Sequence, residues 1–377
     1  MLKSSEKLKY IDAIRGIAIL AVLVIHCREY VESGALIPSA FSFIINQGPR
    51  GVQLFYIASA FTMFFTLTGR VKKENNPTRN FFIRRVFRIA PMYWIAIVYY
   101  LWQNGRGPSY WLGDAPGISN MNIAANFLFI HGFNAYWINS LVPGGWSIAV
   151  EMSFYCLVPF LFSKIKNSLH AINFFFITMI INFIAGYLLH THQLIADALL
   201  WKNFLTLYLP YQMPVFALGI LFYFLVKGDY ASLRFSWVTF VLCLIMFAVK
   251  FFTAMPLITS HLLFAMSFVI MGFVMSKKEF KIVVNPVVRY IGKVSYSMYL
   301  VHFAVLYFMV KWNFANYITE TTATSALLNY GIRLILLIII SAAISTVFYN
   351  LIEVPAQKVG KNIIDRLEKK KAVVSVS

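Results

Sequence analysis

Charged residues are scarce in this chain of 377 residues. Only 12% of them are charged and 60% are hydrophobic, whereas soluble domains usually carry about 25% charged residues. Acidic residues are the rarer kind, with 14 Asp and Glu against 33 Lys and Arg and a formal net charge of +19. This balance excludes an ordinary soluble domain and predicts an integral membrane protein.

Cysteine and the common catalytic motifs are nearly absent. Cys27, Cys156 and Cys243 lie far apart in apolar runs with no C-x-x-C spacing, which excludes a disulfide framework and favours buried free thiols. The sequence has no G-x-S-x-G elbow, no Walker loop and no H-E-x-x-H. No motif therefore supports a serine esterase or a metal hydrolase, and we expect no bound metal.

The abundant residues are those of membrane spans, which need roughly 20 mostly apolar residues each. Asp12 and Arg15 interrupt the first apolar run and no cleavage site follows it, so we interpret it as a permanent helix and not a signal peptide. Asn122–Phe133 is too short to span and is interpreted as re-entrant or interfacial. The candidate spans are Ile11–Tyr30, Val52–Gly69, Ile89–Trp102, Ser147–Ser163, Leu169–His190, Leu205–Val226, Phe235–Phe252, Leu257–Ser276, Val294–Val310 and Ala326–Ile352.

The predicted fold is all-α: a polytopic membrane helix bundle of about ten transmembrane helices. Basic residues gather in alternate connections, an asymmetry that places both termini in the cytoplasm. The same pattern favours the lipid bilayer, and not nucleic acid, as the partner of the positive charge. We expect residues 1–357 to form the membrane domain, 358–377 a basic cytoplasmic tail with a short surface helix, and Asn104–Gly145 the main outer loop.

Two ionisable side chains in the first span are candidates for function, because charge inside a bilayer is unfavourable. Arg15 and His26 are three helical turns apart, so they share a face and are separated by ~16 Å along the axis. Arg15 is expected near the cytoplasmic end and His26 in the outer half. Gly16 lets another helix approach Arg15 closely. Alternatively, Asp12 and Arg15 pair at i,i+3 and His26 is an interfacial residue.

The fourth span begins with Trp146 and Ser147 and carries Glu151 one turn later. We expect Ser147 to cap this helix, which runs inward and brings Glu151 to the depth of His26. A carboxylate that orients an imidazole is a general-base arrangement. Alternatively, Glu151 pairs with Arg333, an intramembrane arginine in the outer half of the last span.

Three arginines mark the cytoplasmic entrance to the third span. Arg84 and Arg88 share a helix face at i,i+4, and Arg85 is adjacent. The planar fork of arginine suits phosphate, so a nucleotide-bearing donor is one candidate ligand. A plain positive-inside anchor or a contact with anionic lipid explains the same spacing.

Tyr299 and His302 are neighbours at i,i+3, and His302 is expected in mid-membrane. Such a pair is as often structural as catalytic. We assign no role to the histidines at span ends or outside them, which are His131, His170, His190, His192 and His261.

Five sequence blocks resemble, in order and over nearly the whole chain, those of the acyltransferase-3 family of membrane O-acyltransferases. That family carries an Arg and a His with ten residues between them in its first helix, an arginine motif, a W-S-x-x-x-E block and two C-terminal signatures. Met152 stands where the family often has a second acidic residue. The matching blocks are Tyr10–Ala18 with His26, Arg84–Trp94, Trp146–Tyr155, Ser295–His302 and Glu353-x-Pro355.

The resemblance implies an acyl-CoA donor, usually acetyl-CoA, and an acceptor that is a bacterial surface or lipid-linked glycan. It also implies a multi-pass protein of the bacterial inner membrane. On this hypothesis the CoA phosphates bind Arg84, Arg85 and Arg88. His26, oriented by Glu151, acts as general base or transient acyl carrier, and Arg15 or Arg333 stabilises the oxyanion. We expect Trp146, Ser147, Tyr299, His302 and Arg333 to support the substrate or the site.

A transporter or flippase for a glycan or a small solute is the alternative function. It accounts equally well for the spans and for the intramembrane charges. It does not explain an arginine cluster combined with a His and a Glu at matched depth.

Overall fold

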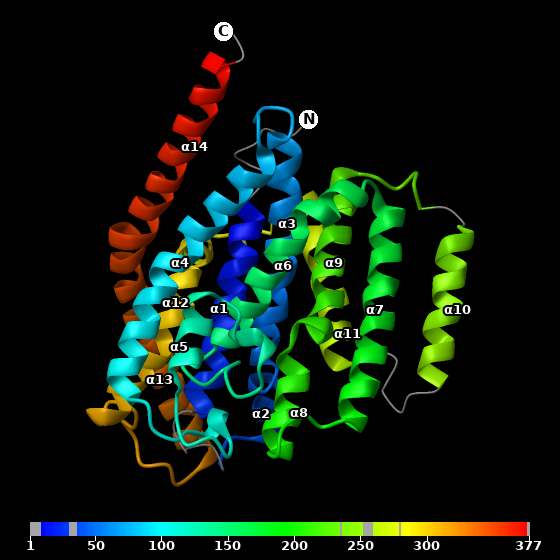
Figure 1. Cartoon of the computed structure of the whole chain (residues 1–377). Coiled ribbons are helices and arrows are strands. Elements are labelled where there is room, and N and C mark those ends of the chain that lie inside the picture. The colour runs from blue at the N-terminus through cyan, green and yellow to red at the C-terminus, as the bar shows by residue number, and fades with distance from the viewer. Residues whose placement is uncertain (1–8, 30–35, 234–235, 252–258, 279, 375–377) are drawn as a thin grey trace. The chain divides into compact units, whose positions relative to one another are not determined.

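The computed structural model describes residues 9–29, 36–233, 236–251, 259–278 and 280–374. All regular elements in these ranges are helices (Figure 1), which confirms the predicted all-α class. The chain divides into two compact units. The first unit is Met1–Phe55 with Val274–Ile352, and the second is Tyr56–Phe273 with Glu353–Ser377.

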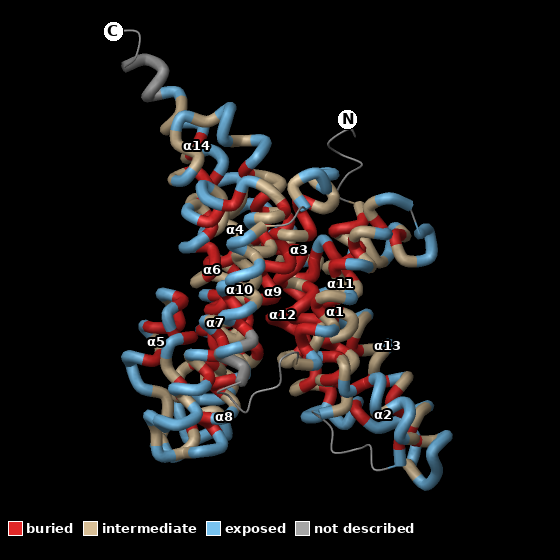
Figure 2. Tube along the Cα trace, turned by 90° about the vertical axis from the view of Figure 1, so that its right-hand side faces the viewer, coloured by how far each residue is buried: buried red, intermediate tan, exposed pale blue. Residues whose placement is uncertain are grey.

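The first unit is built on three long helices. α1 (Lys9–Glu29) packs against both α12 (Pro286–Lys311) and α13 (Ala323–Phe348), and α12 packs against α13. Buried residues, red in Figure 2, gather along α1 and α12. Two short helices, α2 (Ser39–Ile45) and η2 (Gly48–Arg50), lie against α1, and the π-helix η5 (Tyr349–Glu353) follows α13.

Glycine sets the contact between α1 and α12. A Cβ on Gly16 would overlap the carbonyl of Val288, and a Cβ on Gly292 would overlap the carbonyl of Asp12. The Gly292 Cβ position is also 3.0 Å from the backbone nitrogen of Gly16. The two backbones therefore meet at a glycine–glycine crossing of the small-residue kind, and the expectation that a helix approaches Gly16 is confirmed.

The second unit holds the remaining long helices. Within it α7 packs on α9 and on α10, α6 packs on α9, and α14 packs on α4. Its helices are α3 (Gly51–Arg70, which begins in the first unit), α4 (Pro77–Asn104), α5 (Asn120–Phe127), α6 (Gly145–Lys164), α7 (Ser168–Thr191), α8 (Ala198–Leu207), α9 (Leu209–Lys227), α10 (Trp237–Phe251), α11 (Ser260–Lys277, which ends in the first unit) and α14 (Val354–Val374), with the short η3 (Tyr110–Leu112) and η4 (His131–Phe133).

α4 starts at Pro77, before the predicted span Ile89–Trp102 and also before the earlier start around Phe82 that the shortness of this run suggests. The Asn76 side chain accepts a hydrogen bond of 3.1 Å from the Arg79 amide, and Pro77 occupies the first helical position, where its missing N–H costs nothing. The arginine cluster thus lies inside the helix. Over 28 residues the helix is ~42 Å long, so it connects the segment around Glu74 with the loop that follows Gly105.

Eight helical runs in the described residues are long and apolar enough to cross a membrane. Each predicted span is centred on a different helix, although Leu205–Val226 crosses the break at Tyr208 between α8 and α9 and Ala326–Ile352 continues into η5. α4 and α10 are not among these eight runs, so the number ten stays a prediction. The predicted span ends Tyr30, Phe235, Phe252 and Leu257 lie outside the described residues. The eight runs are Lys9–Glu29, Ser39–Arg70, Gly145–Lys164, Ser168–Thr191, Ala198–Lys227, Ser260–Lys277, Pro286–Lys311 and Ala323–Lys369.

Two further expectations concern the tail and the thiols. The tail is helical, as predicted, and α14 begins at Val354, so the predicted boundary at 357/358 falls inside this helix.

The expectation of three buried thiols is wrong for two of them. Cys27 is buried, Cys156 is exposed and Cys243 is intermediate, because an apolar helix of a membrane protein need not turn every face toward other helices.

We expect Gly292→Ala to lower the free energy of unfolding by about 1–3 kcal/mol, because α1 and α12 must move apart to admit a Cβ. Gly331→Ala in α13 is the matched control, since its Cβ meets nothing within 4 Å. Thermal unfolding of both variants in detergent measures the difference. Equal midpoints for the two variants would contradict the glycine crossing.

Candidate active site

His26 lies in the last turns of α1 and has a carboxylate partner. Its Nδ1 is 3.1 Å from Oε2 of Glu29, and the side chains are 27% and 58% exposed. A carboxylate only accepts, so this contact assigns the proton to Nδ1 and leaves the lone pair on Nε2. Glu29 was missed from the sequence, although its i,i+3 spacing is the signal that identifies such a pair.

His302 on α12 stacks on His26, with ring centroids 5.4 Å apart and planes inclined by 29°. It is fully buried, and its Nδ1 is 3.1 Å from the carbonyl oxygen of Met298. A carbonyl also only accepts, so the lone pair of His302 is on Nε2, a buried atom with no hydrogen-bond partner. An orphaned buried acceptor costs about 1–3 kcal/mol, which marks this ring as a candidate for function.

Aromatic rings complete the surroundings of the two imidazoles. The Phe303 ring centroid is 4.5 Å from that of His26. Tyr299 is buried, with its ring 5.9 Å from that of His302 and edge-on to Phe55 at 6.2 Å. The predicted neighbours Tyr299 and His302 are therefore brought together with His26 in the first unit.

Arg15 and Arg333, the two predicted oxyanion ligands, both have carboxylate partners in the first unit. Arg15 Nη1 is 3.8 Å from Asp12 Oδ1, which agrees with the alternative pairing at i,i+3. Arg333 is 1% exposed, and its Nη2 is 3.8 Å from Glu320 Oε1. The loop between α12 and α13 therefore supplies the charge partner of Arg333, and Glu320 was not anticipated.

Hydrogen bonds hold Arg333 against that loop and against α1. Its Nε donates to the carbonyl of Ala315 at 2.6 Å, Nη2 to Oδ1 of Asn316 at 2.8 Å, and Nη1 to the carbonyl of Cys27 at 3.5 Å. One buried guanidinium thus fixes the end of α1 one residue after His26. A positioning role suits this geometry.

Glu151 lies on α6 in the second unit. The Tyr155 hydroxyl donates to its Oε1 at 2.6 Å, Ser59 of α3 donates to the same oxygen, and Ser59 and Tyr155 are 3.3 Å apart. Sequence analysis missed both partners. His26 and Glu151 belong to different units, so their pairing stays a prediction.

The expectation that Ser147 caps α6 is wrong. Gly144, with φ of +76°, is the N-cap and the helix begins at Gly145, so Ser147 is already its third residue. Its hydroxyl donates back to the Gly144 carbonyl at 2.9 Å, and its own carbonyl accepts from the Tyr56 hydroxyl at 3.2 Å. A left-handed backbone favours glycine, which explains why glycine and not serine starts the helix.

Trp146 anchors the same turn by packing. Its ring meets the Tyr56 ring edge-on at 6.4 Å. It also covers a buried cluster that joins the segment between η4 and α6 to α8. The cluster residues are Ala135, Ile138, Trp201, Phe204, Leu205 and Tyr208. Trp146 and Ser147 thus position the start of α6, four residues before Glu151.

His131, to which the sequence assigned no role, is fully buried beneath this turn. Its Nε2 is 3.0 Å from the Tyr93 hydroxyl and 3.1 Å from the Gly145 carbonyl, and Tyr93 donates to Asn126 Oδ1 at 3.0 Å. Burial lowers the pKa of His131 to about 4. The network ties α4, α5 and η4 to the first residue of α6.

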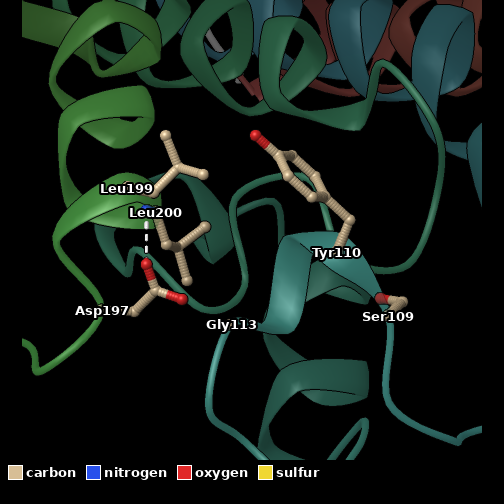
Figure 3. A pocket seen from close by; sticks show the side chains of 6 residues that line it. All are labelled: Ser109, Tyr110, Gly113, Asp197, Leu199 and Leu200. Carbon is tan, nitrogen blue, oxygen red and sulfur yellow. Dashed lines mark hydrogen bonds between the residues drawn. The ribbon is translucent and has the colours of Figure 1, made fainter.

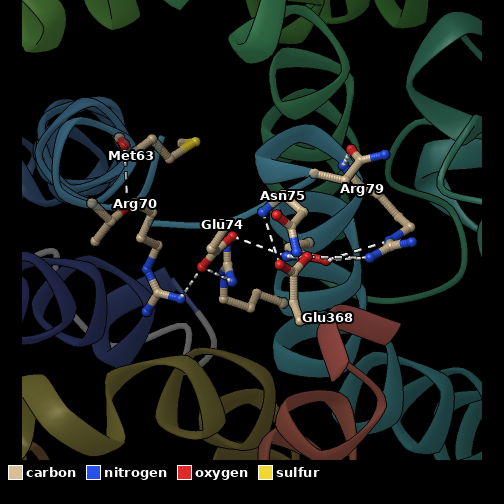
Figure 4. Close-up of polar contacts among 10 residues, drawn as sticks. Met63, Arg70, Glu74, Asn75, Arg79 and Glu368 are labelled. Carbon is tan, nitrogen blue, oxygen red and sulfur yellow. Dashed lines mark hydrogen bonds and ion pairs between the residues drawn. The ribbon is translucent and has the colours of Figure 1, made fainter. Parts of the chain in front are cut away.

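Glu74 and Glu368 pair with two of the four arginines in the first turns of α4 (Figure 4). Arg84 forks onto Glu74 at 2.9 and 3.0 Å, and Arg79 contacts Glu368 of α14 at 3.3 Å. Asn80 donates to both carboxylates, at 3.1 and 2.8 Å. Burial raises the pKa of Glu74, but hydrogen bonds from Arg84 and Asn80 outweigh it, so the pKa lies below its usual value.

The other two arginines have different surroundings. The Arg85 guanidinium carbon is 5.6 Å from the ring centroids of both Phe81 and Tyr155. Its neighbour Tyr155 is the residue that donates to Glu151. Arg88 is partly buried and, in the described part of the chain, makes no hydrogen bond or ion pair. Of the predicted donor ligands, Arg84 is therefore the one already paired.

The buried neutral state of His131 predicts a pH dependence of stability. Because its pKa falls from 6.5 to about 4 on folding, the unfolded chain takes up the proton first as the pH falls. The contribution of the neutral His131 to the free energy of unfolding is fully present above pH ~6.5 and decreases toward pH 4. Between pH 7.5 and pH 5 the free energy of unfolding falls by about 2 kcal/mol for this reason. Unfolding midpoints in detergent across this range measure it.

His131→Gln is the control for this prediction, since its amide reaches the position of Nε2 but does not titrate. We expect the variant to lose about 2 kcal/mol less than the wild type over the same pH range. A variant with the full acid sensitivity of the wild type would show that His131 is not its source.

Comparison with known proteins identifies the family of the chain. A family model described as an acyltransferase domain, that of the acyltransferase-3 family, matches residues 8–350. No curated protein and no solved structure gave a match. The matched range begins just before α1, ends in η5 and includes all predicted site residues. The chain therefore belongs to the acyltransferase-3 family and is a membrane acyltransferase.

Proposed function

We propose that this protein is an O-acetyltransferase that moves an acetyl group from cytoplasmic acetyl-CoA to a hydroxyl of a lipid-linked or surface glycan. The bacterial inner membrane is its proposed location. The contact that carries the proposal is His26 Nδ1 to Glu29, at 3.1 Å. It leaves a basic nitrogen on a partly exposed ring within an otherwise apolar bundle. Family membership favours this function over a transporter.

His26 is the proposed general base. Its Nε2 takes the proton of the acceptor hydroxyl while the hydroxyl oxygen attacks the thioester carbonyl. The carbon–sulfur bond then breaks, and the CoA thiolate leaves and recovers the proton from His26. If His26 carries the acyl group instead, Nε2 attacks the thioester carbonyl, the carbon–sulfur bond breaks and the CoA thiolate leaves. The acceptor oxygen then attacks the acyl-imidazole, the bond to Nε2 breaks, and the hydroxyl proton passes to the CoA thiolate.

The neighbours of His26 suit the charge that this step creates. Glu29 lies within hydrogen-bond distance and attracts the imidazolium. The Phe303 ring at 4.5 Å offers a π face to the same cation. Glu29 is therefore proposed as the orienting carboxylate, in the role that sequence analysis gave to Glu151.

His302 is the proposed second contact of the acceptor. Its Nε2 lone pair is buried and has no partner, so a second hydroxyl of the acceptor, other than the one that is acylated, would satisfy this nitrogen by donating to it. That hydrogen bond would hold the acceptor beside the stacked ring of His26. His302 thus positions the acceptor so that its neighbouring hydroxyl can give its proton to His26.

The CoA phosphates are proposed to bind at the start of α4. Arg88 makes no ion pair with a carboxylate in the described residues, and Arg85 is hydrogen-bonded with Tyr155 and attracted by Glu151, whereas Arg84 is forked onto Glu74. Arginine binds phosphate bidentately through its planar fork. A donor phosphate reaches Arg84 only by displacing Glu74, so Arg85 and Arg88 are the first ligands on this proposal.

His26→Ala is expected to reduce acetyl transfer at least about a hundredfold, because general-base catalysis contributes that much or more. Purified protein receives acetyl-CoA and a bacterial glycan extract, and the release of free CoA and the acetylated glycan are measured. His190→Ala, an exposed histidine at the end of α7, is the control and should match the wild type. Near-normal transfer by His26→Ala would eliminate the proposal.

The same assay compares the two candidate orienting carboxylates. Glu29→Gln removes the charge beside His26 and is expected to lower kcat about tenfold, with KM for acetyl-CoA little changed. Glu151→Gln is the comparison, since this carboxylate is already bonded to Ser59 and Tyr155. If only Glu151→Gln lowered kcat, the orienting role would return to Glu151.

A further inference from the structure

A small pocket opens in the outer-loop region of the second unit. It has a volume of about 240 Å³ and is formed by the segment around η3 and the start of α8 (Figure 3). Ligand sites for drug-sized molecules measure ~300–1,000 Å³, so this pocket suits one small unit of a ligand. Its lining residues are Ser109, Tyr110, Gly113, Asp197, Leu199 and Leu200.

The pocket and the arginine cluster lie at opposite ends of α4. The helix begins at Pro77, beside Glu74, and ends at Asn104, five residues before the pocket starts. A helix of this length covers the ~30 Å hydrocarbon core of a bilayer. A ligand of this pocket therefore approaches from the face opposite to the proposed donor.

Asp197 places a carboxylate in the pocket wall. Its Oδ1 accepts a hydrogen bond of 2.8 Å from the Leu200 amide and so caps α8. Its Oδ2 faces the loop, and a Cβ on Gly113 would lie only 2.7 Å from it. Gly113 has φ of +54°, a conformation that favours glycine. The glycine thus lets the loop approach the carboxylate without a side chain that fills the space between them.

Tyr110 supplies a fixed aromatic face. Its ring is 63% exposed, yet its hydroxyl accepts a hydrogen bond of 2.9 Å from Asn203 Nδ2. Leu199, 56% exposed, adds an apolar surface. An exposed ring held in place by its polar end is a preorganised contact surface that loses little entropy on binding.

We propose that this pocket binds one uncharged sugar unit of the acceptor glycan. The C–H face of the sugar ring packs on Tyr110 and Leu199, and its hydroxyls donate to Asp197 and bond with Ser109. No lining residue is basic, so a phosphate or an acidic sugar would meet only the negative charge of Asp197. The inference rests on the proposed glycan acceptor and adds where it is recognised and which sugars are admitted.

The test measures sugar binding directly, without acetyl-CoA. Saturation-transfer NMR is recorded on the full-length protein in nanodiscs with the methyl glycosides of glucose, galactose, N-acetylglucosamine and glucuronic acid. We expect transfer to at least one neutral glycoside and much less to the glucuronide. Tyr110→Ala should weaken the neutral contact about tenfold.

Two charge variants form a matched pair. Asp197→Asn keeps the α8 cap, because asparagine caps as well as aspartate, and should weaken neutral binding and abolish discrimination against the glucuronide. Asp114→Asn makes the same charge change in the loop that follows η3, on a carboxylate that accepts from Tyr136 at 2.8 Å and does not line the pocket. It should bind like the wild type.

The inference is overturned if the wild type binds none of the glycosides, or if Tyr110→Ala and Asp197→Asn bind them as it does. Its failure is distinct from failure of the proposed function. If the wild-type protein binds sugar at this pocket but transfers no acetyl group, the sugar-binding assignment is supported and the transferase proposal is contradicted. If transfer proceeds and the pocket variants leave KM for the acceptor unchanged, the pocket assignment falls alone.

Discussion

The glycine crossing between α1 and α12 sets the positions of the two histidines on which the proposed chemistry depends. With Gly16 and Gly292 in contact, the two helices run parallel, and His26 and His302 each follow ten residues after their glycine. Ten residues of helix rise ~15 Å, so both imidazoles arrive at one level and stack at 5.4 Å. A bulkier residue at either crossing position would separate the helices and with them the two rings.

Two hydrogen-bond acceptors determine which nitrogen of each ring carries the proton. The Glu29 carboxylate accepts from Nδ1 of His26 and the Met298 carbonyl accepts from Nδ1 of His302, which leaves Nε2 as the nitrogen with the lone pair in both histidines. His26 keeps some exposure while His302 has none, so the two have different proposed tasks: proton transfer for His26 and positioning for His302. In the second unit, carboxylates instead restrain Arg79 and Arg84, and Arg85 and Arg88 are the proposed phosphate ligands.

Much of the fold could be predicted from the sequence, because apolar runs of span length are independent of distant contacts. The start of α4 could not be predicted, because its first turns are rich in arginine and therefore do not resemble an apolar span, although Asn76 and Pro77 begin a helix there. Contacts made by loops could not be predicted either. Glu320 contacts Arg333 because of the path that the α12–α13 loop takes, and His131 is buried because the turn at Gly145 packs over it. Glu29 was visible in principle, but a carboxylate at a helix end resembles an ordinary solvated residue.

The central claim is that the His26 imidazole is the reactive group and can be reached by the thioester donor. Carbethoxylation with diethyl pyrocarbonate, which attacks neutral imidazole, tests this directly when followed by peptide mass spectrometry with and without acetyl-CoA. The account predicts that His26 is modified, that buried His302 is not, and that acetyl-CoA protects His26. An unmodified His26, or one modified equally in the presence of a saturating donor, would contradict it.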